Sequence, residues 1–206
     1  MNGLLYGIVD IGYVASTDVR RVTEQLLSGG VDLIQLRAKK LSKTEIVRLA
    51  GEMLEITRRS GVSLILNDYA DLLREVDADG CHLGQEDLAV AAARELVGRP
   101  CIIGKSTHSI QQAIRSQADG ADYIGFGPLF ATATKPSAEA IGLADIRAVH
   151  QQVTIPVYCI GGIKVGNLSE VLAAGARRVC IVSDLLLAKD IAKRTRTVKQ
   201  ILEEST

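Results

Sequence analysis

Residues 64–88, LILNDYADLLREVDADGCHLGQEDL, contain two short apolar runs that are each followed at once by acidic and amide residues. The first run, 64–66, precedes Asp68, and the second, 80–83, precedes Asp87. Apolar runs this short, separated by a helical pattern, are typical of buried parallel strands. This stretch therefore predicts two neighbouring strands of a parallel α/β fold.

Two carboxylates would meet at one rim of such a sheet if Asp68 and Asp87 follow adjacent strands. The carboxyl ends of the strands are where parallel α/β folds carry their chemistry. Carboxylate oxygens suit Mg²⁺, which usually takes one or two of them and shares a substrate phosphate. The alternative is that both residues cap the helices that follow, since Asp is a favoured N-cap. These two residues alone leave both interpretations open.

The composition is that of an ordinary globular protein, with 47% hydrophobic and 23% charged residues among 206. Lys plus Arg equals Asp plus Glu at 24 each, which indicates neither a nucleic-acid partner nor a membrane surface. The four cysteines lie in or beside apolar runs, as small buried residues do in a reducing compartment. The first residues lack a basic segment and read as a strand, so we expect a cytoplasmic protein.

The order of elements predicts the fold class. Strands are expected at residues 4–9, 33–36, 63–66, 80–83, 101–104, 123–126, 157–160 and 179–182. Helical patterns are expected at residues 17–28, 42–60, 68–76, 87–97, 109–117, 143–152 and 167–174, with a last helix ending near 203. Eight strands alternating with eight helices predict a single (β/α)8 TIM barrel of parallel strands over residues 1–206.

Glycines support this assignment. Gly30, Gly80, Gly120 and Gly175 precede the even-numbered strands and fit positions just after helices, where left-handed backbone favours Gly. An open doubly wound sheet would more often have a glycine-rich turn after the first strand, which this sequence lacks. The longest irregular stretch, 127–142, has the length of an active-site loop.

Polar groups follow several strands. Gln35, Arg37 and Lys39 alternate along one side of the second strand, where they would hold a polyanion or form a solvated basic turn. After the fifth strand, Ser106 could offer a hydroxyl to an anion or base, and His108 is either a general acid or a surface residue.

The later strand ends carry groups that suit phosphate. Thr132, Thr134 and Lys135 form either a phosphate clamp or an ordinary polar loop. The turn at residues 161–162 is Gly-Gly, and Ser183 follows the last strand; barrels frequently bind phosphate with these two loops. The rim would thus bind a monophosphate and a diphosphate with Mg²⁺, which indicates a transferase or lyase without a covalent nucleophile.

At these positions the sequence resembles the thiamine-phosphate synthase family, which belongs to a superfamily shared with thiazole tautomerases. The matching motifs are residues 35–39, Asn67-Asp68 with Asp71, 79–88, 104–109, 127–130 with Thr132, Thr134 and Lys135, Gly161-Gly162, and Val182-Ser183. They occur in order and span nearly the whole chain.

The resemblance implies an enzyme that joins an aminopyrimidine diphosphate to a thiazole phosphate, releasing pyrophosphate and forming thiamine phosphate. It implies that ionisation of the pyrimidine–diphosphate bond precedes attack by the thiazole nitrogen. Matched residue by residue, it implies Mg²⁺ at Asp68 and Asp87, and diphosphate at Arg37, Lys39, Asn67 and Lys135. It implies the pyrimidine or its leaving group at Gln35 and Ser106. Thr132 and Thr134 would line the thiazole side, with Gly162, Val182 and Ser183 at the phosphate of the thiazole.

The sequence differs from the family pattern at two places, and two alternative functions stay open. The family's first strand usually ends in Thr-Asp where this chain has Val9-Asp10, and residues 164–167 do not match closely. A thiazole tautomerase would use His108 for proton transfer, without diphosphate or metal. A regulator that binds thiazole or thiamine phosphates without turnover is the other rival. The sequence does not decide between a monomer and a homo-oligomer.

Overall fold

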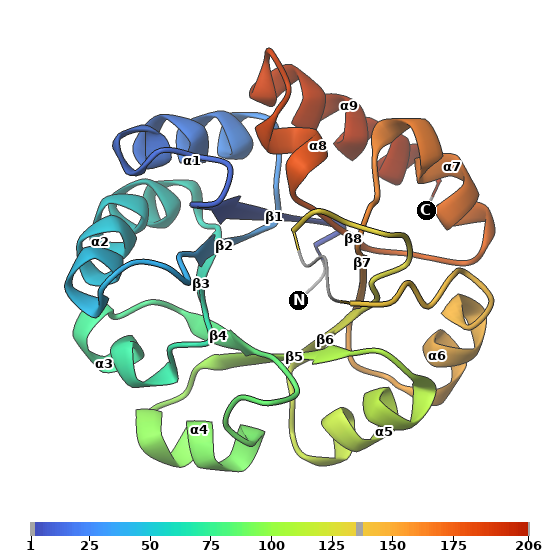
Figure 1. Cartoon of the computed structure of the whole chain (residues 1–206), viewed down its shortest axis with the longest axis horizontal. Helices are drawn as coiled ribbons and strands as arrows, with labels where there is room; N and C mark the ends of the chain where they lie inside the picture. The colour runs from blue at the N-terminus through green and yellow to red at the C-terminus, as the bar shows by residue number, and fades with distance from the viewer. Residues whose placement is uncertain (1–2, 135–137, 206) are drawn as a thin grey trace.

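The protein is a closed barrel of eight parallel strands in sequence order, each followed by helical chain on the outside (Figure 1). The structure is a computed structural model that describes residues 3–134 and 138–205, so Lys135 lies outside the described residues. The strands are β1 (Leu5–Asp10), β2 (Leu33–Arg37), β3 (Ser63–Asn67), β4 (Gly80–Leu83), β5 (Ile102–Thr107), β6 (Tyr123–Phe126), β7 (Val157–Ile160) and β8 (Val179–Ile181). The predicted TIM barrel is confirmed.

The helices surround the barrel. They are α1 (Val19–Ser28), α2 (Lys43–Ser60), α3 (Leu73–Val76), α4 (Val90–Val97), α5 (Ile110–Ala118), α6 (Ile146–Gln152), α7 (Val165–Ala173), α8 (Ser183–Leu186) and α9 (Ile191–Glu204). Short 3-10 turns, η1 (Ser16–Asp18) and η2 (Ala70–Leu72), precede α1 and α3. The sequence did not predict α8, which is a single turn directly after β8.

The helices α3 and α4 begin later than predicted, and this excludes a helix-capping role for the rim carboxylates. The helix α3 starts at Leu73 and α4 at Val90, and their N-cap residues are Leu72 and Ala89. Asp68 and Asp87 lie in the turns before these helices, so the interpretation of these residues as helix caps is wrong.

Local signals elsewhere behave as expected, with one exception. Ser42 and Glu45 form the predicted capping box of α2. Gly30, Gly120 and Gly175 have positive φ after their helices, as predicted. Gly80 was wrongly assigned to this set: it lies inside β4, where an added Cβ would lie 2.0 Å from the Ile102 carbonyl oxygen. Its lack of a side chain allows close approach to β5.

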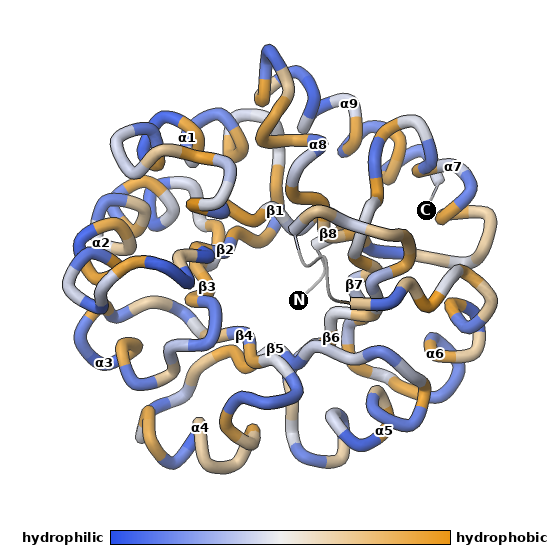
Figure 2. The backbone as a smooth tube through the Cα atoms, in the orientation of Figure 1, coloured by the Kyte–Doolittle hydropathy of each residue, from blue (hydrophilic) through white to orange (hydrophobic). Residues whose placement is uncertain are grey.

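The core consists of the barrel interior and the layer between strands and helices. The strands are coloured hydrophobic over much of their length in Figure 2, whereas the helices alternate between polar and apolar residues. Three tyrosines fill the barrel interior with edge-to-face contacts, Tyr6, Tyr123 and Tyr158. In the described part of the chain, no helix is long and apolar enough to cross a membrane.

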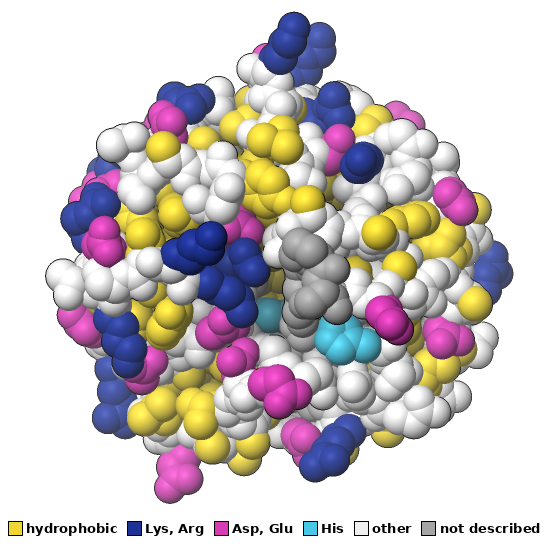
Figure 3. Space-filling view, viewed as in Figure 1, with side chains coloured by type: hydrophobic (Ala, Val, Ile, Leu, Met, Phe, Trp, Pro, Cys, Tyr) yellow, Lys and Arg dark blue, Asp and Glu magenta, His cyan; other side chains and the backbone are white. Residues whose placement is uncertain are grey.

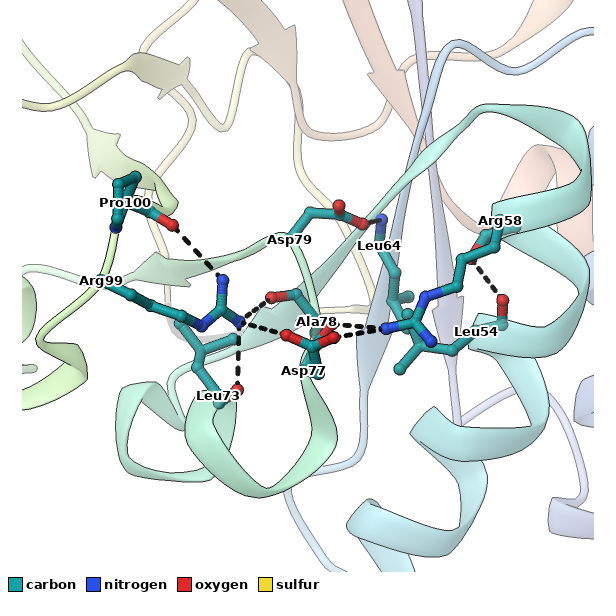
Figure 4. Close-up of polar contacts among 10 residues, drawn as sticks. Leu54, Arg58, Leu64, Leu73, Asp77, Ala78, Asp79, Arg99 and Pro100 are labelled. Atoms are coloured by element: carbon teal, nitrogen blue, oxygen red, sulfur yellow. Dashed lines mark hydrogen bonds and ion pairs between the residues drawn. The ribbon is translucent and has the colours of Figure 1, made fainter.

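A charged cluster lies at the end of the barrel where the strands begin (Figure 4). Arg99 donates to the carbonyl oxygens of Leu73 and Ala78, at 3.2 and 2.6 Å, and Arg58 pairs with Asp77 at 2.7 Å. The bond from Arg99 satisfies the Ala78 carbonyl in the segment that leads into β4, and its bond to Leu73 adds a second donor to a carbonyl that already accepts from the Asp77 N–H. The cluster therefore holds together the connection between α3 and β4.

Candidate active site

Asp68 and Asp87 are neighbours at the rim where the strands end. Asp68 follows β3 in left-handed backbone, with φ of 67°, and its N–H donates to the His82 carbonyl of β4 at 2.9 Å. Asp87 Oδ2 accepts from the Gly84 N–H at 2.6 Å, which fixes the turn after β4. The predicted convergence of the two carboxylates is therefore present.

The electrostatics of this pair favour a cation. Burial raises the pKa of Asp68; Lys39, whose Nζ lies 3.0 Å from Asp68 Oδ2, opposes this, and the Asp87 charge raises the pKa further. Oxygen donors close enough to repel each other suit Mg²⁺. Within residues 3–134 and 138–205 no group of three or more His, Cys, Asp or Glu could hold a metal, so further ligands would have to come from elsewhere, such as substrate oxygens.

The basic groups at this rim differ in how they are held. Lys39 has a side chain that is 51% exposed and contacts Asp68, whereas Arg37 is bound by Asp10 at 2.6 Å. Asp10 is buried at the end of β1, so Arg37 has a fixed position on the cavity wall. The side-chain nitrogen of Asn67 is buried at the same cavity, with no hydrogen-bond partner among the described residues.

One cavity at the centre of the rim brings most of the predicted site residues together. The following predicted residues line it: Gln35, Arg37, Lys39, Asn67, Asp68, Ser106, His108, Thr132, Thr134, Gly162, Val182 and Ser183. Asp87 is not in the lining itself but contacts two residues that are, Asp68 and Gly84. Left of the centre of the face in Figure 3, Lys and Arg side chains lie beside Asp and Glu side chains in the region of β2 to β4.

The opposite side of the cavity consists of the loops after β6, β7 and β8. Gly162 has φ of 66°, and an added Cβ would lie 2.7 Å from the Phe130 Cβ, so only Gly permits the close approach of these loops. Thr134 Oγ1 lies 3.0 Å from the Tyr13 hydroxyl, which ties the β6 loop to the loop after β1. Gly162, Thr132, Thr134 and Ser183 thus line the cavity from the loops after β6, β7 and β8, whereas the two carboxylates follow β3 and β4.

Lys105, on β5, is a buried residue that the sequence analysis did not interpret. Its ammonium donates to the carbonyl oxygens of Gly84 and Leu88, at 2.6 and 3.3 Å. Burial lowers its pKa, while the nearby Asp87 acts in the opposite direction. Lys105 therefore holds the turn that carries Asp87. A lysine inside an apolar strand is the signal that could have identified it.

A buried polar chain is the second feature that the sequence analysis missed. His82 on β4 lies 2.9 Å from Ser106 Oγ through Nε2 and 3.0 Å from the Tyr123 hydroxyl through Nδ1. Burial, with a smaller effect of Lys105, lowers the pKa of His82 to about 4. His82 is thus a neutral imidazole at physiological pH. Polar-tipped residues within otherwise apolar strands were the available signal.

His108 also lies at the cavity. Its Nδ1 contacts the carbonyl oxygen of Gly127, and its backbone N–H donates to Gln112 Oε1 at 2.7 Å. Ser109, the next residue, is the N-cap of α5 and accepts from the Gln112 N–H at 3.2 Å. The ring of His108 is therefore held by the β6 loop.

A TIM barrel with neighbouring carboxylates, cations and a glycine-lined pocket at the ends of its strands belongs to the class of barrel enzymes that act on phosphorylated small molecules. A family model described as thiamine monophosphate synthase matches residues 5–185. The chain belongs to this family. The family and the transferase class predicted from the sequence motifs are confirmed.

Individual members of the family match this chain along nearly their full length. The thiamine-phosphate synthase of Chloroflexus aurantiacus is 42% identical over 199 residues, covering 96% of this chain and 92% of that protein. The thiamine-phosphate synthase of Halalkalibacterium halodurans is 40% identical over 201 residues, covering 97% and 95%. The solved thiamine phosphate pyrophosphorylase from Pyrococcus furiosus superposes with a TM-score of 0.88 at 34% identity, covering 98% of this chain and 96% of that one.

Proposed function

We propose that this chain transfers the pyrimidinylmethyl group of an aminopyrimidine diphosphate to the nitrogen of a thiazole phosphate, forming thiamine phosphate and pyrophosphate. The observation that carries the proposal is the cavity that unites the carboxylate pair, the basic residues of β2 and the glycine-lined pocket, because two phosphorylated substrates require two anion sites. Family membership supports the same reaction.

Asp68 and Asp87 would hold Mg²⁺. The donor set fits, because two neighbouring carboxylates with a raised Asp68 pKa favour the approach of a cation. Bound there with the substrate, the ion would neutralise charge on the diphosphate and make it a better leaving group. Lys105 keeps the Asp87 turn in place through the Gly84 carbonyl.

Lys39, Arg37, Asn67 and Lys135 would bind the diphosphate. Lys39 can move from Asp68 toward an incoming phosphate because half of its side chain is exposed, and Arg37 offers a guanidinium fixed by Asp10. The unpartnered amide nitrogen of Asn67 supplies a donor at the same wall. These groups stabilise negative charge that grows on the leaving pyrophosphate as the C–O bond breaks.

Gln35 and Ser106 would contact the pyrimidine, while Thr132, Thr134, Gly162, Val182 and Ser183 would hold the thiazole phosphate. The C–O bond breaks first and its electron pair leaves with pyrophosphate; the thiazole nitrogen then forms the new C–N bond to the pyrimidinylmethyl carbon. Because the thiazole nitrogen is the nucleophile, the protein supplies positioning and electrostatic stabilisation. Phosphorylated substrates and four free cysteines support a cytoplasmic location.

The experiment mixes purified protein with both substrates, in Mg²⁺ or in chelator, and measures thiamine phosphate and pyrophosphate. We expect the two products in equal amounts and only with the metal. Tautomerisation of a thiazole carboxylate phosphate without these products would favour the rival that uses His108. Binding of thiazole or thiamine phosphate without any turnover would favour a regulator.

A further inference from the structure

A continuous hydrogen-bonded chain crosses the interior of the barrel, and four of its five side chains line the cavity. The Gln35 amide nitrogen contacts the Tyr6 hydroxyl, which lies 2.9 Å from the Tyr123 hydroxyl. Tyr123 lies 3.0 Å from His82 Nδ1, and His82 Nε2 lies 2.9 Å from Ser106 Oγ. The chain thus joins the two side chains assigned to the pyrimidine, Gln35 and Ser106, which come from β2 and β5.

The surroundings of this chain hold its members in fixed positions. Gln35, Tyr6 and Tyr123 are at most 2% exposed. Gly104 on β5 leaves the space that the Tyr123 phenol occupies, because an added Cβ would lie 2.1 Å from the ring and 2.4 Å from its hydroxyl oxygen. Buried polar groups that are fully hydrogen-bonded specify one arrangement and resist rearrangement.

The direction of the hydrogen bonds follows from the donor at one end. The Gln35 amide nitrogen can only donate, so the Tyr6 oxygen accepts this bond. The buried Tyr6 hydroxyl hydrogen then has a partner in this chain only if it is donated to Tyr123, which is the arrangement we assign. Tyr123 in turn donates to His82 Nδ1. A neutral imidazole that accepts at Nδ1 carries its proton on Nε2.

Ser106 is the last residue of this hydrogen-bonded chain. His82 Nε2–H donates to Ser106 Oγ, so the hydrogen of Ser106 is free to point elsewhere. Ser106 lines the cavity. Its hydroxyl is therefore arranged to donate into the space where the substrate ring would lie.

We propose that His82 is a positioning residue that, through this chain, holds Ser106 as a hydrogen-bond donor to an acceptor nitrogen of the pyrimidine ring. The inference rests on the proposed function for the identity of the ring. It assigns to the barrel interior a part in substrate selection: a ring with C–H in place of that nitrogen leaves the Ser106 donor unpaired.

The state of His82 can be measured without any substrate. In protein labelled with ¹⁵N at histidine, we expect one of the three rings to be the Nε2–H form with an unprotonated Nδ1. The signal is assigned to His82 if it is absent from the spectrum of His82→Gln. In Tyr123→Phe, which removes the donor to Nδ1, the Nδ1 resonance should move. A His82 ring that is protonated on Nδ1, or on both nitrogens at pH 7, would overturn the proposal.

Kinetics test whether the chain acts on the predicted substrate. Tyr123→Phe keeps the ring but breaks the chain, and we expect kcat/KM for the pyrimidine diphosphate to fall about 10-fold. The KM for the thiazole phosphate should stay within about 2-fold, since that substrate is assigned to the loops after β6, β7 and β8 and not to the hydrogen-bonded chain. Equal losses for both substrates would indicate a merely structural role and overturn the proposal.

Tyr158→Phe is the matched control. Tyr158 packs edge-on against Tyr6 and Tyr123 at centroid distances of 5.3 and 5.7 Å, but its hydroxyl donates to the Gly3 carbonyl, outside the chain. It should leave both kinetic parameters near wild type. If Tyr123→Phe behaves as Tyr158→Phe does, the chain has no role in positioning.

Substrate analogues give the sharpest test. Two pyridine analogues, each lacking one ring nitrogen, are compared in the wild type and in Ser106→Ala. For one analogue, the loss in kcat/KM caused by the missing nitrogen and the loss caused by Ser106→Ala should not add, because both changes remove the same hydrogen bond. Full additivity for both analogues would refute the assigned donor. A wild type that makes no thiamine phosphate would instead refute the proposed function, while the histidine tautomer would still report on the chain.

Discussion

The two ends of the barrel both carry charged clusters, yet their charges are satisfied differently. Where the strands begin, Arg99 and Arg58 pair with Asp77 and with backbone carbonyls that close α3 (Figure 4). Where the strands end, Asp68 lies beside another carboxylate, and Asn67 has a buried nitrogen without a partner among the described residues.

This difference separates charges that stabilise the fold from charges to which we assign a ligand in the proposed function. A guanidinium that donates to several carbonyls completes bonds that the backbone needs. Neighbouring carboxylates repel each other, and burial adds a desolvation cost to the charge of Asp68, which the half-exposed Lys39 opposes. A cation bound between the carboxylates would relieve their repulsion. The same residue types thus have opposite consequences at the two ends.

The largest expected effect is the loss of turnover in Asp68→Asn. Asn tolerates the left-handed backbone at φ of 67°, so the change removes the charge without straining the turn. We expect kcat to fall about 100-fold or more, because the predicted metal loses a carboxylate. Steady-state assays with Mg²⁺ measure this.

Asp77→Asn is the matched control, because Asp77 also has left-handed backbone, with φ of 56°, at the opposite end of the barrel. Its turnover should equal that of the wild type. Unchanged turnover in Asp68→Asn would show that the rim carboxylate is not part of the catalytic machinery.

Arg99→Met should show the reverse pattern. The substitution keeps an apolar stem but removes the guanidinium that donates to the Ala78 carbonyl, and it leaves the Leu73 carbonyl with the Asp77 N–H alone. We expect a loss of about 2 kcal/mol in the free energy of unfolding, measured with urea, and a kcat within 2-fold of wild type. A stability close to that of the wild type would mean that water replaces the guanidinium at no cost.

A smaller effect is expected for Ser42→Ala. Ser42 lies at the same end of the barrel as the active site, but its side chain accepts from the Glu45 N–H in the capping box of α2. Its loss should cost about 1 kcal/mol of stability with no change in activity. A change in KM for either substrate would show that polar groups of this rim are coupled more widely than the contacts indicate.

The sequence predicted the parts of this molecule that depend on local pattern. Apolar runs and caps located all eight strands and the α2 capping box, and the alternation of elements predicted the barrel. The position of Asp68 at the rim followed from parallel strands alone. Strand and helix ends were less accurate: β5 continues to Thr107, so Ser106 lies on the strand itself.

The features that the sequence could not predict are contacts between side chains across the barrel. The pairing of Arg37 with Asp10 joins residues 27 positions apart, and the contact between Tyr6 and Tyr123 joins residues 117 positions apart. Neither partner carries a local signal of the other. His82 read as part of an apolar run, because its role appears only when the facing strands bring Tyr123 and Ser106 to its two nitrogens.

The smallest expected effect is a change in how the stability of Asp68→Asn depends on pH. The folded protein raises the pKa of Asp68 above its ordinary value of 3.8, mainly by burial, so the folded state holds this proton more tightly than the unfolded chain does. The stability from that proton is fully present below pH 3.8 and is lost as the pH rises through the raised pKa. The variant, which cannot ionise there, should therefore match the wild type in acid and exceed it as the pH rises above 3.8, with a difference that stops growing once the pH has passed the raised pKa. Melting temperatures measured without Mg²⁺ would show this. A variant that becomes less stable than the wild type as the pH rises would mean that the ion pair with Lys39 outweighs burial. The two ends of the barrel would then differ less than their contacts indicate.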